Sequence, residues 1–311
     1  MTQPAHIDTE HERPSLLQRH PVGTFFALTY ATAWVLWLPL VILQDRMPAG
    51  PGLLLAVLGS LMPSTLAILL VWRLQGRGEV RRLLRRLLMA RVSVGWYAAI
   101  VALAALMVFA VWVSTMFGAP TPVVAVTVPG LLSLFLFSVF PGSATGEELG
   151  WRGFALPRLQ ARHSALAASL VVGSVWGTYH FPLFLLGAPI RPFSLFFPFA
   201  LSCVIMSVFY TWMYNGTRGS LFIAVLLHAA TNLPLTVVYA PLERRVLPAY
   251  WIFVGMLALA AAALIARAGT ATLSRSHPKQ TVEGVTGTEP RNSDRSTPAW
   301  PEPAAPSAPR V

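Results

Sequence analysis

The chain has 311 residues, of which 55% are hydrophobic and only 11% are charged. A soluble domain carries about 25% charged residues, and here the charges gather in a few clusters between long apolar stretches, so the composition excludes an ordinary soluble protein and indicates a polytopic membrane protein. The net charge of +11 is dispersed among these clusters, and we therefore expect no nucleic-acid partner.

The chain begins with a polar segment, residues 1–21, which predicts a disordered tail. Eight apolar segments of about spanning length follow, and they predict an all-α fold with about eight transmembrane helices. These segments cover residues 22–43, 52–72, 96–117, 124–141, 164–186, 194–214, 219–239 and 249–267. Together they predict one membrane domain over residues 22–267.

The basic residues alternate between the segments that connect these spans. If the N-terminus is cytoplasmic, 19 of the 23 Lys and Arg residues lie on the cytoplasmic side, and the other four are Arg46, Arg191, Arg244 and Arg245. Basic loops stay in the cytoplasm. The pattern therefore predicts an integral membrane protein with both termini in the cytoplasm, and we expect it in the plasma membrane.

Residues 79–91 separate apolar and basic side chains at helical spacing. The apolar face contains Val80, Leu83, Leu84, Leu87 and Leu88, and the basic face contains Arg81, Arg82, Arg85 and Arg86. This arrangement predicts an amphipathic helix that lies in the membrane interface and contacts lipids.

Two further features concern the last spans and the C-terminus. Cys203 is the single cysteine and lies in a predicted span, where we interpret it as a small buried hydrophobic residue. Residues 268–311 are rich in Pro, Ser, Thr and Ala, so they predict a second disordered tail, again cytoplasmic.

Ionisable side chains within a membrane are rare and usually functional. Here only Glu147 and Glu148 follow directly on a predicted span in the middle of the chain, while every Asp and every other Glu lies in a tail or a loop. His180 and His228 are the histidines that fall inside predicted spans. Asn232 follows His228 by one helical turn and shares its face.

Helical spacing separates the roles of the two glutamates. Glu148 and Arg152 are four residues apart in the favourable acid-first order, which predicts a structural ion pair. Glu147 lies about 100° around the helix, without a salt-bridge partner, and we expect it to meet His180 and His228 across helices. Two alternatives stay open: helix-to-helix hydrogen bonding by the histidines, and a glutamate that is simply solvated at the interface.

Three short motifs occur in order along residues 140–240: "EELGWR", "WGTYH" and "HAATN". They fit the patterns E-E-x-x-x-R, [F/W]-x-x-x-H and H-x-x-x-N, and in this order the chain resembles the CAAX protease and bacteriocin-processing (CPBP, or Abi) family of intramembrane proteases. Trp176 stands where many members have Phe, which keeps an aromatic ring.

The resemblance implies hydrolysis of a peptide bond near the cytoplasmic half of the membrane, and in eukaryotic members removal of the last three residues of prenylated CAAX proteins. It implies that Glu147 is the general base that activates water and that His180 orients the water. By the same resemblance, His228 and Asn232 stabilise the oxyanion. The remaining residues of the first motif support the site, and they are Glu148 and Arg152.

The resemblance leaves the cofactor open. Glu147, His180 and His228 would supply the three protein ligands of a catalytic zinc site, and a metal-free glutamate protease would use the same residues. Other protease chemistries fit less well, because no predicted span contains an Asp, an H-E-x-x-H or a G-x-S-x-G sequence.

Two functions other than proteolysis use the same residues. One is a secondary transporter or proton relay, although we find no inverted repeat to support it. The other is a non-catalytic immunity or scaffold protein that retains the fold. The sequence does not name a substrate beyond a peptide or protein.

Overall fold

The computed structural model describes residues 15–186 and 192–282, and within them every regular element is helical. The long helices are α2 (Pro21–Leu43), α3 (Ala49–Gln75), α5 (Val94–Met116), α6 (Val128–Val139), α9 (Ala165–Tyr179), α11 (Phe196–Gly216), α12 (Leu221–Pro234) and α13 (Val246–Ala268). The short ones are α1 (Leu16–Arg19), α4 (Arg77–Arg85), α7 (Ser143–Glu148), α8 (Leu156–Gln160) and α10 (Phe181–Phe184). Short 3-10 segments are η1 (Gln44–Arg46), η2 (Arg86–Leu88), η4 (Phe193–Leu195) and η6 (Ala240–Arg245), and π-helical segments are η3 (Leu149–Ala155) and η5 (Leu235–Tyr239).

Seven stretches of the described chain are long and apolar enough to cross a membrane, so the protein is an all-α, polytopic integral membrane protein. The predicted span 164–186 differs from the other seven, because α9 ends at Tyr179 and has only 15 residues. At 1.5 Å per residue it is about 22 Å long, less than the ~30 Å of a hydrocarbon core. Pro182, which has no N–H to donate, follows this helix end and lies in the first turn of α10.

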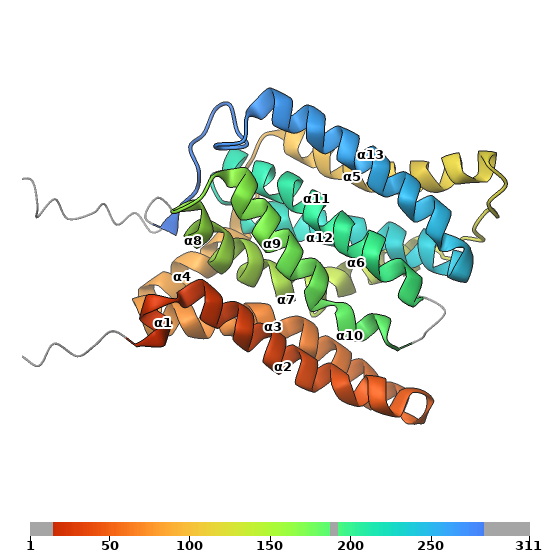
Figure 1. Ribbon diagram of the computed structural model, residues 1–311, viewed down its shortest axis with the longest axis horizontal. Helices are drawn as coiled ribbons and strands as arrows, with labels where there is room; N and C mark the ends of the chain where they lie inside the picture. Colours follow the sequence, from red (N-terminus) through yellow and green to blue (C-terminus); the bar gives the residue numbers. More distant parts are fainter. Residues whose placement is uncertain (1–14, 187–191, 283–311) are drawn as a thin grey trace, which may run out of the picture.

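The helices form a bundle with two outer pairs (Figure 1). Helices α2 and α3 pack together along its lower edge in this view, and α5 and α13 pack together along its upper edge. Between them α9 packs on α11, α7 packs on α3, and α12 contacts α5, α6 and α7. The short helices α1, α4 and α8 lie at one end of the bundle, and α10 lies at the opposite end.

The fourth predicted span, residues 124–141, is longer in the structure. It starts at Val128, where the Thr127 side chain caps the helix, and after a turn at residues 140–142 the chain returns to helix. Val128–Gln160 qualifies as one candidate span of 33 residues. Glu147 and Glu148 therefore lie within this candidate span rather than after it.

Segment 79–91, predicted to be amphipathic, has only part of the predicted division between an exposed basic face and a buried apolar face. Arg81, Arg82 and Arg85 are exposed and Leu83 is buried, as the spacing predicts. Arg86 was expected on the exposed face, but it is buried and donates from Nε and Nη2 to the carbonyl oxygen of Gly219, at 2.8 and 2.6 Å. The α-helix ends at Arg85 and continues as a tighter 3-10 turn, which changes the direction of the next side chains.

The structure describes only parts of the two predicted tails, residues 1–21 and 268–311. Residues 1–14 and 283–311 lie outside the described part of the chain. Ser15 accepts a hydrogen bond from the backbone of Gln18 and forms a capping box on α1, and α2 follows from Pro21. Leu16–Arg19 is therefore helical, and His20 separates it from α2.

Residues 269–282, which we name the C-terminal strap, pack on the bundle instead of forming a tail. The carbonyl oxygens of Ala271 and Thr270 accept hydrogen bonds from Ala165 and Leu166 at the start of α9, where a helix leaves N–H groups without partners. The side chain of Leu273 is fully buried against Ala165 and Val208. The buried side chains of Gln160 and Asn215 also hydrogen-bond to the backbone of the C-terminal strap. Composition does not predict this packing, because it depends on one buried leucine and on hydrogen bonds to the backbone.

We expect Leu273→Ala to lower the thermal unfolding temperature in detergent by about 5 °C, because it opens a cavity that costs ~2–3 kcal/mol. Leu259→Ala is the matched control, since Leu259 is 74% exposed on α13 and its truncation opens no cavity. Equal unfolding temperatures for the two variants would show that the C-terminal strap does not stabilise the bundle.

Candidate active site

The two glutamates lie at the end of α7, which packs closely on α3. A Cβ at Gly146 would lie 2.7 Å from the carbonyl oxygen of Ser60, and one at Gly150 would lie 2.7 Å from Pro63. Small residues spaced by four let two membrane helices approach closely. Ser64 fixes this contact with a hydrogen bond of 2.7 Å to the carbonyl oxygen of Thr145.

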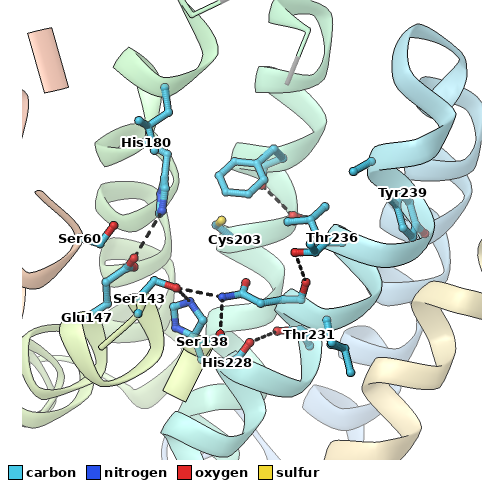
Figure 2. A pocket seen from close by; sticks show the side chains of 18 of the residues that line it. Ser60, Ser138, Ser143, Glu147, His180, Cys203, His228, Thr231, Thr236 and Tyr239 are labelled. Carbon is cyan, nitrogen blue, oxygen red and sulfur yellow. Dashed lines mark hydrogen bonds and ion pairs between the residues drawn. The ribbon is translucent and has the colours of Figure 1, made fainter. Parts of the chain in front are cut away.

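Glu147 is 1% exposed, and its two carboxylate oxygens have different surroundings. Oε2 accepts hydrogen bonds from the indole N–H groups of Trp176, at 2.6 Å, and Trp151, at 3.3 Å. Oε1 accepts no hydrogen bond from any described residue, and it lies 3.7 Å from Nε2 of His180. Figure 2 shows the Glu147 and His180 side chains pointing toward each other.

His180 is the residue directly after α9, and its ring is held by its own helix. Nδ1 donates to the carbonyl oxygen of Trp176 at 2.8 Å, because a carbonyl oxygen only accepts. In the neutral ring, Nε2 therefore carries a lone pair. Two hydrogen-bond acceptors, Glu147 Oε1 and His180 Nε2, thus face each other at 3.7 Å.

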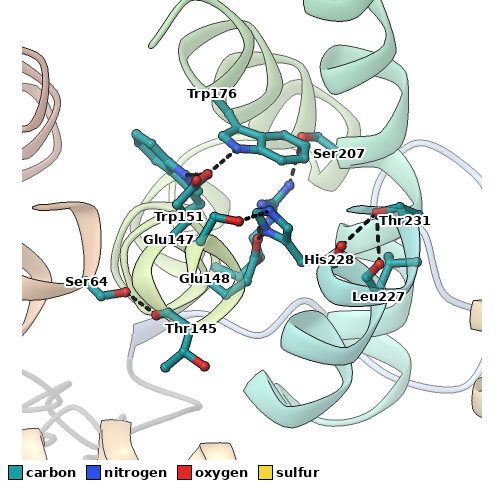
Figure 3. Close-up of polar contacts among 12 residues, drawn as sticks. Ser64, Thr145, Glu147, Glu148, Trp151, Trp176, Ser207, Leu227, His228 and Thr231 are labelled. Carbon is teal, nitrogen blue, oxygen red and sulfur yellow. Dashed lines mark hydrogen bonds and ion pairs between the residues drawn. The ribbon is translucent and has the colours of Figure 1, made fainter. Parts of the chain in front are cut away.

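Glu148 is fully buried, and its carboxylate has hydrogen-bonding partners on two sides (Figure 3). Arg152 donates from Nη1 to both of its oxygens, at 2.8 and 3.0 Å, so the structure contains the ion pair that the spacing predicts. His228 Nδ1 lies 2.7 Å from Glu148 Oε1. The Arg152 guanidinium is fixed in turn by Ser207 at 3.1 Å and by the ring of Tyr210, 3.6 Å away.

The partner of His228 is therefore not the one that we expected. The sequence predicts that Glu147 meets both histidines, whereas His228 is hydrogen-bonded to Glu148 and only His180 faces Glu147. The reason is the angle of about 100° between the two glutamates on one helix. It directs Glu147 toward the end of α9 and Glu148 toward α12.

Asn232 and two serines that sequence reasoning missed form a polar group beside His228. Asn232 Nδ2 donates to the hydroxyl oxygens of Ser143, at 2.9 Å, and Ser138, at 3.1 Å. The Ser143 hydroxyl also lies 3.4 Å from His228 Nε2. No periodic pattern in the sequence marks these serines, which lie on either side of Pro141 just before the first motif.

These side chains share one cavity with a volume of about 570 Å³. Glu147, His180, His228, Asn232 and Ser143 lie on its wall, and most other lining residues are apolar. The lining includes Cys203, which is buried as expected. The arrangement thus gathers the four residues to which the sequence assigns a catalytic role.

The three zinc ligands that the sequence proposes do not come together. His228 is hydrogen-bonded to Glu148 through Nδ1, and its Nε2 faces Ser143. Across residues 15–186 and 192–282, no three His, Cys, Asp or Glu side chains are placed to hold one metal ion. Glu147 and His180 converge as a pair, so the donor set is one ligand short of a three-residue zinc site.

Comparison with known proteins finds a likeness over the same region. Residues 128–234 match the family model described as "Type II CAAX prenyl endopeptidase Rce1-like". The chain is also 33% identical over 130 residues to CAAX prenyl protease 2 of Methanococcus maripaludis. The aligned part covers 40% of this chain and 46% of the relative, so the chain spans about half the length of the curated relative that it matches.

We expect Arg152→Ala to destabilise the protein by about 3–5 kcal/mol, because it leaves the buried Glu148 carboxylate without its cation. Arg82→Ala is the control, because Arg82 pairs with Glu79 at a position where its side chain is 49% exposed, and such a pair contributes ~0–1 kcal/mol. Thermal unfolding in detergent measures both. If the two variants lost the same stability, the buried pair would not support the site.

Proposed function

We propose that this chain is an intramembrane endopeptidase of the Rce1-like CAAX protease family, whose family model residues 128–234 match, and that it hydrolyses a peptide bond in the cavity with Glu147 as general base. The observation that carries this proposal is the pair of facing acceptors, Glu147 Oε1 and His180 Nε2, 3.7 Å apart. A general base must lie within about 2.6–3.2 Å of the heavy atom whose proton it removes, or reach it through one water molecule.

We assign the activation of water to these two atoms. A water molecule between them donates one hydrogen to Glu147 Oε1 and the other to His180 Nε2, which leaves an oxygen lone pair for the scissile carbonyl. As the C–O bond forms, Glu147 takes the proton and becomes a carboxylic acid. When the C–N bond breaks, this acid returns the proton to the leaving amine.

We assign the stabilisation of the oxyanion to His228 and Asn232. Both approach one point, the Ser143 hydroxyl oxygen, which lies 2.9 Å from Asn232 Nδ2 and 3.4 Å from His228 Nε2. Two nitrogen atoms that converge on one oxygen form the geometry that a developing oxyanion needs. His228 donates from Nε2 when it is protonated, with Glu148 holding Nδ1.

The proposed substrate is a peptide or protein that reaches the cavity from the membrane. The family resemblance favours CAAX-type processing, and peptide or bacteriocin-related proteolysis is the second class. We further propose that both termini are cytoplasmic in a plasma membrane, and that the exposed residues Arg81, Arg82 and Arg85 contact anionic lipid headgroups.

The two rival functions differ from this proposal in what they predict. A secondary transporter or proton relay would use Glu147 and His180 to move ions, and a non-catalytic immunity or scaffold protein would use them only for packing. Neither rival hydrolyses a peptide, so turnover by purified protein distinguishes them from a protease.

We expect Glu147→Gln to lower peptide hydrolysis by at least about 10²-fold, because the amide removes no proton, while the protein still folds and inserts. Glu79→Gln is the matched control, since Glu79 lies on α4 away from the cavity, and it should keep wild-type turnover. Near-normal hydrolysis by Glu147→Gln would contradict the assignment of the general base.

The second test asks whether hydrolysis requires a bound zinc ion. Because the three expected ligands do not converge, we propose that Glu147 activates water without zinc. Active, detergent-purified enzyme should then contain well under one metal per chain and should keep its activity in chelator. Stoichiometric zinc that chelator removes with loss of activity, and that both His180→Ala and His228→Ala lose, would contradict the metal-free mechanism.

A further inference from the structure

Trp176 contacts both members of the proposed water-binding pair. Its indole N–H donates to Glu147 Oε2 at 2.6 Å, and its backbone carbonyl accepts from His180 Nδ1 at 2.8 Å. The residue lies on α9, one turn before His180, and it lines the cavity. Figure 3 shows its indole nitrogen directed at the Glu147 carboxylate.

The indole N–H matters because a glutamate carboxylate has little orientation preference of its own. Its last torsion angle is broad and roughly two-fold, so packing alone does not determine how the plane of the carboxylate is turned toward His180. Trp176 and Trp151 both donate to Oε2, and this leaves Oε1 for His180. The shorter of the two hydrogen bonds, 2.6 against 3.3 Å, comes from Trp176.

The ring of Trp176 is itself held in place. The guanidinium of Arg152 lies 4.6 Å from its centre. The rings of Tyr210 and His228 contact it at centroid distances of 5.6 and 5.5 Å. A donor on a side chain fixed by its neighbours orients a catalytic group more sharply than a mobile donor does.

We propose that Trp176 is a positioning residue, whose indole N–H holds the Glu147 carboxylate with Oε1 toward His180. This role rests on the proposed function of Glu147, and it adds a polar role to a position where the family pattern requires only an aromatic ring. Phe at this position keeps a ring over Arg152 and loses the N–H.

The hydrogen bond is tested without any activity assay. In protein labelled with 15N-tryptophan, the indole N–H resonance of Trp176 should lie far downfield and should move upfield in Glu147→Gln, because a neutral amide accepts more weakly than a carboxylate. The resonance of Trp151, assigned through Trp151→Phe, should move less. A Trp176 resonance unchanged by Glu147→Gln would overturn the proposal.

The positioning role is tested by kinetics. We expect Trp176→Phe to lower kcat by about tenfold, with KM changed by less than about twofold, because a misplaced general base slows the chemical step rather than binding. A benzothienylalanine at position 176, which has the same ring shape without the N–H, should give the same loss and also keeps the packing. Trp212→Phe is the control, since Trp212 packs on Trp96 away from the cavity, and it should keep the wild-type kcat.

The outcomes separate the two proposals. A wild-type kcat with benzothienylalanine at position 176 would overturn the positioning role, and so would a loss that appears in KM instead of kcat. A wild-type protein that hydrolyses no peptide would overturn the proposed function, and the NMR experiment would then still decide whether Trp176 fixes Glu147.

Discussion

Two adjacent carboxylates buried in an apolar protein need separate compensation, because an unpaired buried charge is costly. Glu148 receives a guanidinium and an imidazole, from Arg152 and His228. From the described residues, Glu147 receives only the N–H groups of two indoles, on one of its oxygens. One carboxylate is therefore committed to structure, while the other keeps an oxygen available for a proton. The proposed chemistry depends on this difference.

The helices around the site hold the two glutamates in these different environments. Gly146 and Gly150 let α7 and η3 lie against α3, and this places both glutamates inside the bundle. Helix α9 ends at Tyr179, so that His180 follows at its end, beside the cavity. The C-terminal strap supplies backbone acceptors to the start of the same helix. The C-terminal strap thus fixes the start of α9, the helix that carries His180 at its other end.

The sequence predicted the features of the structure that depend on hydropathy and on helical spacing. Hydropathy indicated the apolar helices, and spacing indicated the Glu148–Arg152 pair. Spacing did not reveal which neighbouring helix each face contacts, so it assigned His228 to Glu147 instead of Glu148. It also missed Ser143, because a serine hydroxyl near a turn has no periodic pattern. The role of the Trp176 indole N–H was also missed. The motif accepts either Phe or Trp at this position, so it indicates an aromatic ring but not a hydrogen-bond donor.

The central claim is that Glu147 and His180 together hold the attacking water. An experimental structure of the wild-type protein that resolves single water molecules tests it most directly. The account predicts one water within about 2.6–3.2 Å of both Glu147 Oε1 and His180 Nε2, with Oε2 still bonded to Trp176. A direct hydrogen bond between Oε1 and Nε2 with no water between them would contradict it, and so would a Glu147 carboxylate bonded to His228.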